Sequence, residues 1–580
     1  MSLSLHSPPR IKRKRKLWGP RLMLLCFFVL VVGSIGIWYV NQLPSTEHVA
    51  PFDGKTNVIV FNGEAFEQPY RTENGQIMLP FDFIKAHLDP NAFWDEPTNS
   101  LIITTKDKVL RMESGQLTAY LNKTPVSLQI PLTEQDGISY VPYAPLEKLY
   151  PFQLDLVAET NVLKVAKHGA SVQEGKVLSD GDAQPLRIGA SVKNPIVGEL
   201  AGDSIVQVLA ELEGWYRVQA ENGLVGYLPK EAVSLTTIKT IAPVSPTIQQ
   251  EAAAWKPLGK KIVLAWEQVT KKTANTANFP EMAGLNVVSP TWFELKDDKG
   301  TFTNKADAAY VKWAHSKGYK VWGLVSNGFN PDWTKAVLGN FTLREKMIAQ
   351  ILQYASMYKL DGINLDFENV YIDEKDKLVQ FVRELTPYLH EQGLTVSMDV
   401  TIKSTSDRWS RFYDRARLAE TVDYMAVMTY DEHPAASTVS GSVASLPWTE
   451  DGLKGVLEEV PHQKLLLGVP FYTRLWKEVK QQDGTVKVSS KALSMTSAQE
   501  WISERKLTPA PDAETGQLFV SYTDPTDNAT YKMWLEDETS IQKRMDLVHK
   551  YKLAGTAVWR RGFETPNIWT TIDEQLKPGN

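Results

Sequence analysis

The stretch Tyr358-Lys-Leu-Asp-Gly-Ile-Asn-Leu-Asp-Phe-Glu-Asn369 decides the fold of this chain. In a β-strand the side chains alternate between two faces. One face of this strand then carries three apolar side chains: Ile363, Leu365 and Phe367. The other carries an amide and two carboxylates: Asn364, Asp366 and Glu368. Charged groups are seldom placed side by side on a mostly buried strand unless chemistry needs them. A half-exposed strand with a solvated acidic face is the alternative, but the flanking segments favour a buried strand.

The segments around this strand predict a barrel. From residue 258 onward, strand and helix patterns alternate, which is typical of parallel βα units. The clearest helix follows Thr342-Leu-Arg-Glu345, a pattern typical of a capping box. Eight strands are predicted, the number that closes a (β/α)8 barrel: Ile262–Trp266, Val287–Pro290, Lys320–Val325, Gly362–Phe367, Thr395–Val400, Tyr424–Met428, Leu465–Val469 and Gly555–Trp559.

The fold class is therefore predicted to be α/β, with a TIM barrel over residues 258–580 as its largest part. A long gap separates the seventh strand from the eighth, and Leu518–Tyr522 inside it is strand-like. We expect an inserted α+β subdomain over about residues 473–553.

The acidic face of the opening strand suggests a reaction. Active sites of such barrels lie at the C-terminal ends of the strands, which is where Glu368 stands. Asp366 lies one pleat deeper on the same face and can share a proton with Glu368. Two neighbouring carboxylates cannot both ionise cheaply, so one pKa should rise. A carboxylic acid with a raised pKa is the proton donor that glycoside cleavage needs.

The N-terminus predicts a membrane segment. Residues 10–21 hold seven basic side chains and no acidic one, and an uncharged run from Leu22 to Val40 follows. About 20 apolar residues span a bilayer as a helix, and basic residues before a span favour a cytoplasmic N-terminus. We predict a basic cytoplasmic tail over 1–21, a transmembrane signal anchor over 22–40, and an extracellular catalytic region. A cleaved signal peptide is the alternative.

Composition narrows the classes of partner and cofactor. The formal net charge of −5 does not indicate the basic surface that nucleic-acid binding requires. The only cysteine, Cys26, lies inside the apolar run, so the rest of the chain has no disulfides, as fits a bacterial surface protein. There is no HExxH motif and no cysteine cluster, so neither metal nor cofactor is expected. The 17 Trp and 21 Tyr suit stacking on carbohydrate, although barrel cores also use aromatic residues.

A first small module is predicted over residues 47–170. It carries short strands such as Asn57–Phe61 and Leu101–Thr105. This segment resembles the α+β module found at the N-terminus of copper amine oxidases. Its histidines, His48, His87 and His168, are far apart in the sequence, so the resemblance does not imply copper. We interpret the module as a spacer or a binding domain.

A second module is predicted over residues 171–237. In Gly214–Leu228, strand-like alternation is followed by Asn222-Gly223, a hairpin turn signal. The segment resembles a bacterial SH3-like domain. Such domains often bind cell-wall peptides or glycan, which would make the cell wall a partner, but they can also be plain spacers. The proline-containing residues 238–257 are interpreted as a linker to the barrel.

Four motifs of the barrel together resemble family 18 glycoside hydrolases, the family of chitinases and endo-N-acetylglucosaminidases. They are Asp361-Gly-Ile-Asn-Leu-Asp-Phe-Glu368, Met428-Thr-Tyr-Asp431, Gly468-Val-Pro-Phe-Tyr472 and Trp559. The likeness covers about residues 258–577. Two further runs, Ser442–Trp448 and Trp534–Ser540, look most like the branch of bacterial spore-cortex-lytic and germination-type N-acetylglucosaminidases.

The resemblance implies a substrate-assisted, retaining mechanism in which the N-acetyl group of the substrate is the nucleophile. Glu368 would protonate the glycosidic oxygen and later activate water. Asp366 would orient the acetamido group, and the Tyr430 hydroxyl would bind its carbonyl. The implied substrate-binding residues are Asn364, Asp431, Trp559, Met428 and Trp448. Met428 and Trp448 are equally compatible with a packing role.

One residue departs from the pattern. Asn364 stands where the resemblance leads us to expect aspartate. A neutral amide can hydrogen-bond Asp366 but can neither share a proton with it nor repel it. We therefore carry three hypotheses: an N-acetylglucosaminidase acting on peptidoglycan or a chitin-like glycan, a lectin-like envelope protein that binds glycan without cleaving it, and a structural envelope protein with a vestigial barrel.

Overall fold

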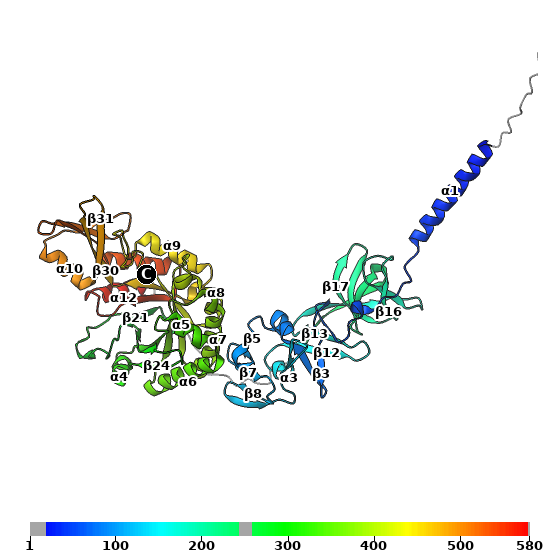
Figure 1. Ribbon diagram of the computed structural model, residues 1–580, viewed down its shortest axis with the longest axis horizontal. Helices are drawn as coiled ribbons and strands as arrows, with labels where there is room; N and C mark the ends of the chain where they lie inside the picture. The colour runs from blue at the N-terminus through cyan, green and yellow to red at the C-terminus, as the bar shows by residue number, and fades with distance from the viewer. Residues whose placement is uncertain (1–18, 243–257, 578–580) are drawn as a thin grey trace, which may run out of the picture. The chain divides into compact units, whose positions relative to one another are not determined.

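The computed structural model describes residues 19–242 and 258–577 (Figure 1). Two compact units divide the chain: Met1–Leu88 with Tyr140–Thr247, and Asp89–Ser139 with Ile248–Asn580. Most of the predicted basic tail and most of the predicted linker lie outside the described residues. The first linker residues, Ile238–Thr240, continue strand β20 (Val233–Thr240).

The apolar N-terminal run forms helix α1 (Gly19–Gln42). Among the residues that the structure describes, no helix is both long enough and apolar enough to cross a membrane. This finding contradicts the predicted anchor over 22–40, and with it the prediction of a single-pass membrane protein with an extracellular catalytic region.

The first unit contains two complete sheets and, in strands β3 (Arg71–Glu73) and β4 (Gln76–Pro80), part of a third. One has the order β12-β13-β1-β2, in which β1 and β13 are parallel. Its strands are β1 (Val58–Phe61), β2 (Glu64–Ala65), β12 (Phe152–Val157) and β13 (Val162–Lys167). The other is the SH3-like sheet, with the order β16-β15-β19-β18-β17-β14-β20.

The SH3-like sheet contains the predicted hairpin. Strands β18 (Trp215–Ala220) and β19 (Val225–Pro229) pair antiparallel on either side of the Asn222-Gly223 turn. Gly223 has a φ of 83°, a left-handed conformation that glycine adopts without a Cβ penalty. The remaining strands are β14 (Ser171–Val177), β15 (Gln184–Arg187), β16 (Ile196–Leu200) and β17 (Ile205–Leu212).

The second unit contains a closed barrel of eight parallel strands. Their order is β22-β21-β35-β29-β28-β27-β26-β25, and a pairing between β22 and β25 closes the ring. The strands are β21 (Ile262–Glu267), β22 (Val287–Pro290), β25 (Lys320–Ser326), β26 (Gly362–Asp366), β27 (Thr395–Thr401), β28 (Tyr424–Met428), β29 (Leu465–Pro470) and β35 (Gly555–Trp559). The eight strands predicted from the sequence are the eight that form.

Helices separate the barrel strands along the chain. They include α4 (Ala308–Ser316), α5 (Pro331–Leu338), α6 (Phe341–Tyr358), α7 (Lys375–Glu391), α8 (Arg415–Thr421), α9 (Leu446–Leu457), α11 (Glu538–Lys550) and α12 (Ile568–Leu576). Helix α6 begins two residues earlier than predicted, because Asn340 rather than Thr342 caps it and accepts the Leu343 N–H at 3.3 Å. The capping box at Thr342 is therefore wrong.

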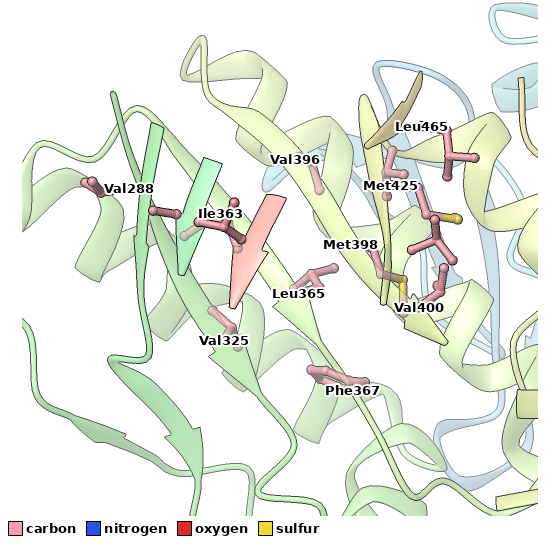
Figure 2. Close-up of a cluster of buried hydrophobic side chains, with 14 of the residues drawn as sticks. Val288, Val325, Ile363, Leu365, Phe367, Val396, Met398, Val400, Met425 and Leu465 are labelled. Carbon is pink, nitrogen blue, oxygen red and sulfur yellow. The ribbon is translucent and has the colours of Figure 1, made fainter. Parts of the chain in front are cut away.

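The apolar face of β26 packs against the helices outside the barrel. Ile363, Leu365 and Phe367 are completely buried, and Figure 2 shows them with side chains of the neighbouring strands. Each of these buried side chains contributes about 1.5–3 kcal/mol to the stability of the fold. With the apolar face turned outward, Asn364 and Asp366 must point into the barrel.

A five-stranded antiparallel sheet lies between β29 and β35 in the chain, where the inserted subdomain was predicted. Its order is β31-β30-β34-β33-β32, and α10 (Met495–Glu504) packs on it. The strands are β30 (Tyr472–Lys480), β31 (Val486–Ser494), β32 (Ala510–Pro511), β33 (Leu518–Asp524) and β34 (Ala529–Leu535).

Part of the segment predicted as a single N-terminal module packs on the barrel. Strands β5 (Phe93–Asp95), β6 (Ser100–Thr104), β7 (Val109–Glu113), β8 (Thr118–Leu121) and β9 (Thr124–Ser127) form one sheet within the second unit. Asp95 pairs with Arg344 of α6 at 3.0 Å, and Arg344 also pairs with Glu384 of α7 at 2.9 Å. All three side chains are buried, so this sheet is anchored by an ion triad.

Candidate active site

The loop after β26 holds Glu368 from two sides. The Asn327 side chain accepts the Glu368 N–H at 3.1 Å and donates to the Glu368 carbonyl at 2.7 Å. The Tyr413 hydroxyl donates to the neighbouring Phe367 carbonyl at 2.8 Å. These hydrogen bonds fix the backbone position of Glu368, and its side chain points over the C-terminal mouth of the barrel.

A cavity of about 730 Å³ opens at this mouth. Its lining contains carboxyl groups and aromatic rings from several strand ends: Trp266, Leu324, Phe329, Asp366, Glu368, Asp399, Thr401, Ile402, Ser404, Trp409, Met428, Tyr430, Asp431, Pro434, Trp448 and Trp559. The volume and the mostly apolar walls with few polar groups are typical of a small-ligand site.

The structure therefore brings together seven of the eight site residues predicted from the sequence. Glu368, Asp366, Tyr430, Asp431, Trp559, Met428 and Trp448 all line the cavity. Asn364 does not. It is completely buried beneath the cavity, where its two side-chain hydrogen bonds run to Asp399 and Ser397.

Glu368 and Asp366 have strongly perturbed acidities. Burial raises the pKa of Glu368 well above its usual range, and the negative charges of Asp366 and Asp431 raise it further. Burial and the charge of Asp399 likewise raise the pKa of Asp366, whereas its hydrogen bond with Glu368 lowers it. That hydrogen bond raises the pKa of Glu368. A raised pKa suits Glu368 to donating a proton.

Tyr430 and Trp559 form an aromatic wall. The Tyr430 ring lies edge-on to Tyr472, with centroids 6.3 Å apart, and Trp559 packs near Trp266 at the same centroid distance. Burial raises the pKa of Tyr430 well above its usual range, so its hydroxyl keeps its proton and can donate a hydrogen bond.

Asp431 is exposed at the rim and is held by the inserted sheet. Its carboxylate accepts the Tyr472 hydroxyl at 2.6 Å and pairs with Arg474 at 3.3 Å, both from β30. Asp431 has a φ of 64°, a conformation that turns the chain sharply after β28. The inserted subdomain therefore positions one polar group of the cavity.

Several cavity residues were not predicted. The most important is Asp399, a third carboxylate that projects into the barrel from β27. A signal existed, because Ser397 and Asp399 alternate with apolar residues in an otherwise apolar strand. Phe329 lies in a loop and Trp409 in the short helix η7 (Asp407–Arg411); their exposed fractions are 41% and 45%, and no periodic pattern marks them. Within residues 19–242 and 258–577, no three acidic, histidine or cysteine side chains are grouped so as to hold a metal ion.

Known proteins share the sequence of this region. Residues 261–564 match glycosyl hydrolases family 18, residues 60–165 match the copper amine oxidase N-terminal domain, and residues 182–234 match the bacterial SH3 domain.

Three relatives show how much of this chain, and of each relative, the sequence similarity covers. The uncharacterized glycosylase YvbX of Bacillus subtilis is 26% identical over 318 residues, which cover 53% of this chain and 90% of YvbX. The cortical fragment-lytic enzyme of Bacillus subtilis is 25% identical over 256 residues, covering 44% of this chain and 58% of the relative. Human di-N-acetylchitobiase is 25% identical over 278 residues, covering 44% of this chain and 70% of the relative. Since the family 18 match takes in more than half of the 580 residues, the chain belongs to the glycosyl hydrolases of family 18.

Proposed function

We propose that this glycoside hydrolase cleaves N-acetylglucosaminyl linkages in peptidoglycan by substrate-assisted, retaining catalysis. The observation that carries the proposal is the pair Glu368 and Asp366 in the lining of an aromatic-walled cavity, where burial raises the pKa of both carboxyl groups. A family 18 chain with that pair has both the acid and the partner that an acetamido nucleophile requires.

In the proposed reaction, Glu368 donates its proton to the glycosidic oxygen as the bond to the leaving sugar breaks. The acetamido carbonyl oxygen attacks the anomeric carbon, and Asp366 stabilises the positive charge that develops on the acetamido nitrogen. The Tyr430 hydroxyl donates to the acetamido group. Glu368, now a carboxylate, takes a proton from the water that opens the ring intermediate.

The remaining lining residues bind the sugar in this proposal. Trp559 forms the apolar floor beneath the reacting ring, because the carbon-bearing face of a pyranose packs on aromatic surface. Asp431 accepts hydrogen bonds from sugar hydroxyls. Met428 and Trp448 complete the walls of the cavity.

Two lines of support favour peptidoglycan over chitin. One of the relatives is named for lysis of cortical fragments, and the chain carries a region that matches bacterial SH3 domains. We propose that the SH3-like region, residues 171–237, binds the cell wall, while residues 47–170 act as a spacer or a second binding module. The similarity to di-N-acetylchitobiase makes chitin oligomers the second candidate substrate.

The test incubates the purified chain with spore-cortex peptidoglycan, vegetative peptidoglycan and chitin oligomers. New reducing ends are counted, and products are identified by mass spectrometry. We expect peptidoglycan fragments ending in N-acetylglucosamine, and proton NMR of the early products should show the anomer of the substrate retained. Glu368→Gln is the matched control, since it keeps the shape and removes the proton. Equal release of reducing ends from peptidoglycan by the wild type and by Glu368→Gln would refute the proposal. Release from chitin alone would mean that chitin, and not peptidoglycan, is the substrate.

A further inference from the structure

Asn364 leaves one position of the barrel interior without a charge, and a carboxylate from the next strand lies against it. The Asn364 side-chain amide donates to Asp399 at 2.5 Å, and the Ser397 hydroxyl donates back to the Asn364 oxygen at 2.6 Å. Strands β26 and β27 pair Asn364 with Ser397 and Leu365 with Met398. Continued by one residue, this register sets Asp399 beside Asp366.

We infer that Asp399 supplies from β27 the carboxylate that Asn364 does not supply from β26, and that it is a positioning residue that controls the protonation of Asp366. This inference rests on the proposed catalytic role of Asp366 and goes beyond the proposed function in assigning a role to a group on a different strand.

Two unsatisfied atoms support the assignment. Asp399 Oδ2 accepts from Asn364 and also from the Trp266 indole at 3.1 Å, but Asp399 Oδ1 is buried without a hydrogen-bond partner. Asp366 Oδ1 is buried in the same unsatisfied state. A buried polar atom without a partner destabilises the folded state. A carboxylate present only to anchor Asn364 and Trp266 would not need its second oxygen at the cavity wall.

One proton on the Asp366–Asp399 pair relieves the repulsion between the two carboxyl groups. The pKa shifts agree with one proton on this pair. Burial raises the pKa of Asp399 well above its usual range, and the charge of Asp399 raises the pKa of Asp366. The titratable groups that face Asp399 from the surrounding elements are Asp366, Glu368, Tyr413 and Tyr430, and its neutral neighbours are Asn364, Ser397 and Trp266. Asp399 thereby sets the pH below which Asp366 is neutral.

The assignment predicts opposite effects for two substitutions. Asp366 must be ionised to stabilise the acetamido cation, so activity falls as the pH drops through the pKa of Asp366. Asp399→Asn removes a negative neighbour, and the acid limb of the pH–rate profile should move to lower pH by about one unit. Asn364→Asp adds a negative neighbour and should move the acid limb to higher pH. The swap Asn364→Asp/Asp399→Asn restores one carboxylate and should return the limb to its wild-type position.

The experiment measures kcat and KM from acidic to alkaline pH for the wild type, both single variants and the swap, on whichever glycan the wild type cleaves. The exposed Asp451→Asn is the control for loss of a carboxylate elsewhere in the barrel unit. Near-ultraviolet circular dichroism checks that each variant is folded. A merely structural Asp399 would lower stability or kcat and leave the acid limb of Asp399→Asn where it lies in the wild type, and that result would overturn the inference.

A second readout does not depend on turnover. Infrared difference spectra count protonated carboxyl groups at neutral pH. We expect one fewer in Asp399→Asn than in the wild type and the wild-type count in the swap. If the wild type cleaves no substrate, the proposed function fails while this count still decides the inference, and an unchanged count in Asp399→Asn would overturn it.

Discussion

The side-chain amide of Asn364 donates a hydrogen bond to the carboxylate of Asp399 across 2.5 Å, from one barrel strand to the next. This bond sets the neutral amide of Asn364 against the acidic side chain of Asp399. Together with Asp366 and Glu368, Asp399 concentrates three carboxyl groups at the mouth of the barrel, and burial raises the pKa of each. Carboxyl groups with raised pKa values are suited to proton transfer, but they lower the stability of the folded state at neutral pH.

The first prediction is that Glu368→Gln stabilises the fold at neutral pH. A carboxyl whose pKa is higher in the folded than in the unfolded chain binds more protons when folded. Stability is therefore lost as the pH rises from the unfolded pKa of Glu, about 4.3, through the raised folded pKa. Glutamine does not ionise, so Glu368→Gln should melt about 2–4 °C above the wild type at pH 7, the shift that ~1 kcal/mol produces in domains of 150–250 residues.

Thermal unfolding from pH 4 to pH 8 measures this effect. The gap between Glu368→Gln and the wild type should close near pH 4, where Glu is protonated in both states. Glu500→Gln on the exposed surface of α10 is the matched control and should track the wild type throughout. A difference in melting temperature of the same size at pH 4 and pH 7 would contradict a raised pKa of Glu368 in the folded chain.

The second prediction concerns Trp409, whose ring lines the cavity with 45% of its surface exposed. An exposed indole at the rim offers a stacking face to a sugar beyond the reacting one. Taking this stacking to be comparable to an aromatic pair, ~0.5–1.5 kcal/mol, Trp409→Ala should raise KM on polymeric glycan about 2–12-fold with little change in kcat. Steady-state kinetics on polymer and on a short chromogenic glycoside measure the split.

A matched control for Trp409→Ala is Tyr120→Ala, because Tyr120 has the same exposed fraction, 45%, and lies on β8 outside the cavity. Trp409→Tyr should retain most of the affinity, since it keeps an aromatic face. If KM rises equally on the short and the polymeric substrate, Trp409 does not contact a distal sugar.

The third prediction concerns Arg344, which is completely buried between Asp95 and Glu384. Removing the cation leaves two buried carboxylates without their partner. Arg344→Ala should lower the free energy of unfolding of the barrel unit by about 3–5 kcal/mol, as loss of one member of a buried ion pair typically does. Lys454→Ala, which breaks an exposed ion pair with Asp451, should cost about 0–1 kcal/mol.

Denaturant unfolding of both variants gives the comparison. A loss for Arg344→Ala no larger than that for Lys454→Ala would mean that the sheet of β5–β9 is not anchored through this triad. Retention of activity by Arg344→Ala at low temperature is expected, because the triad lies outside the cavity.

The barrel could be predicted from the sequence because its signals are local. Each strand is a short apolar run followed by a helical pattern, and eight such units have one common closed arrangement. The catalytic strand was recognisable for the same reason, since the alternation of Ile363, Leu365 and Phe367 with polar residues depends only on strand geometry. The membrane segment was the failure, because hydropathy and flanking charge predicted a span that the described helices do not provide.

The sequence alone thus determined which residues of β26 face the barrel interior, and that Glu368 ends at its mouth. Only the tertiary structure decided what these side chains meet. Asp399 is 33 residues from Asp366 in the chain and reaches it through the register of two parallel strands, which no local pattern specifies. The same holds for Asn327, which holds the Glu368 backbone, and for Tyr472, which holds Asp431. Local periodicity assigns a side chain to a face, whereas burial, neighbouring charge and hence acidity depend on contacts between distant segments.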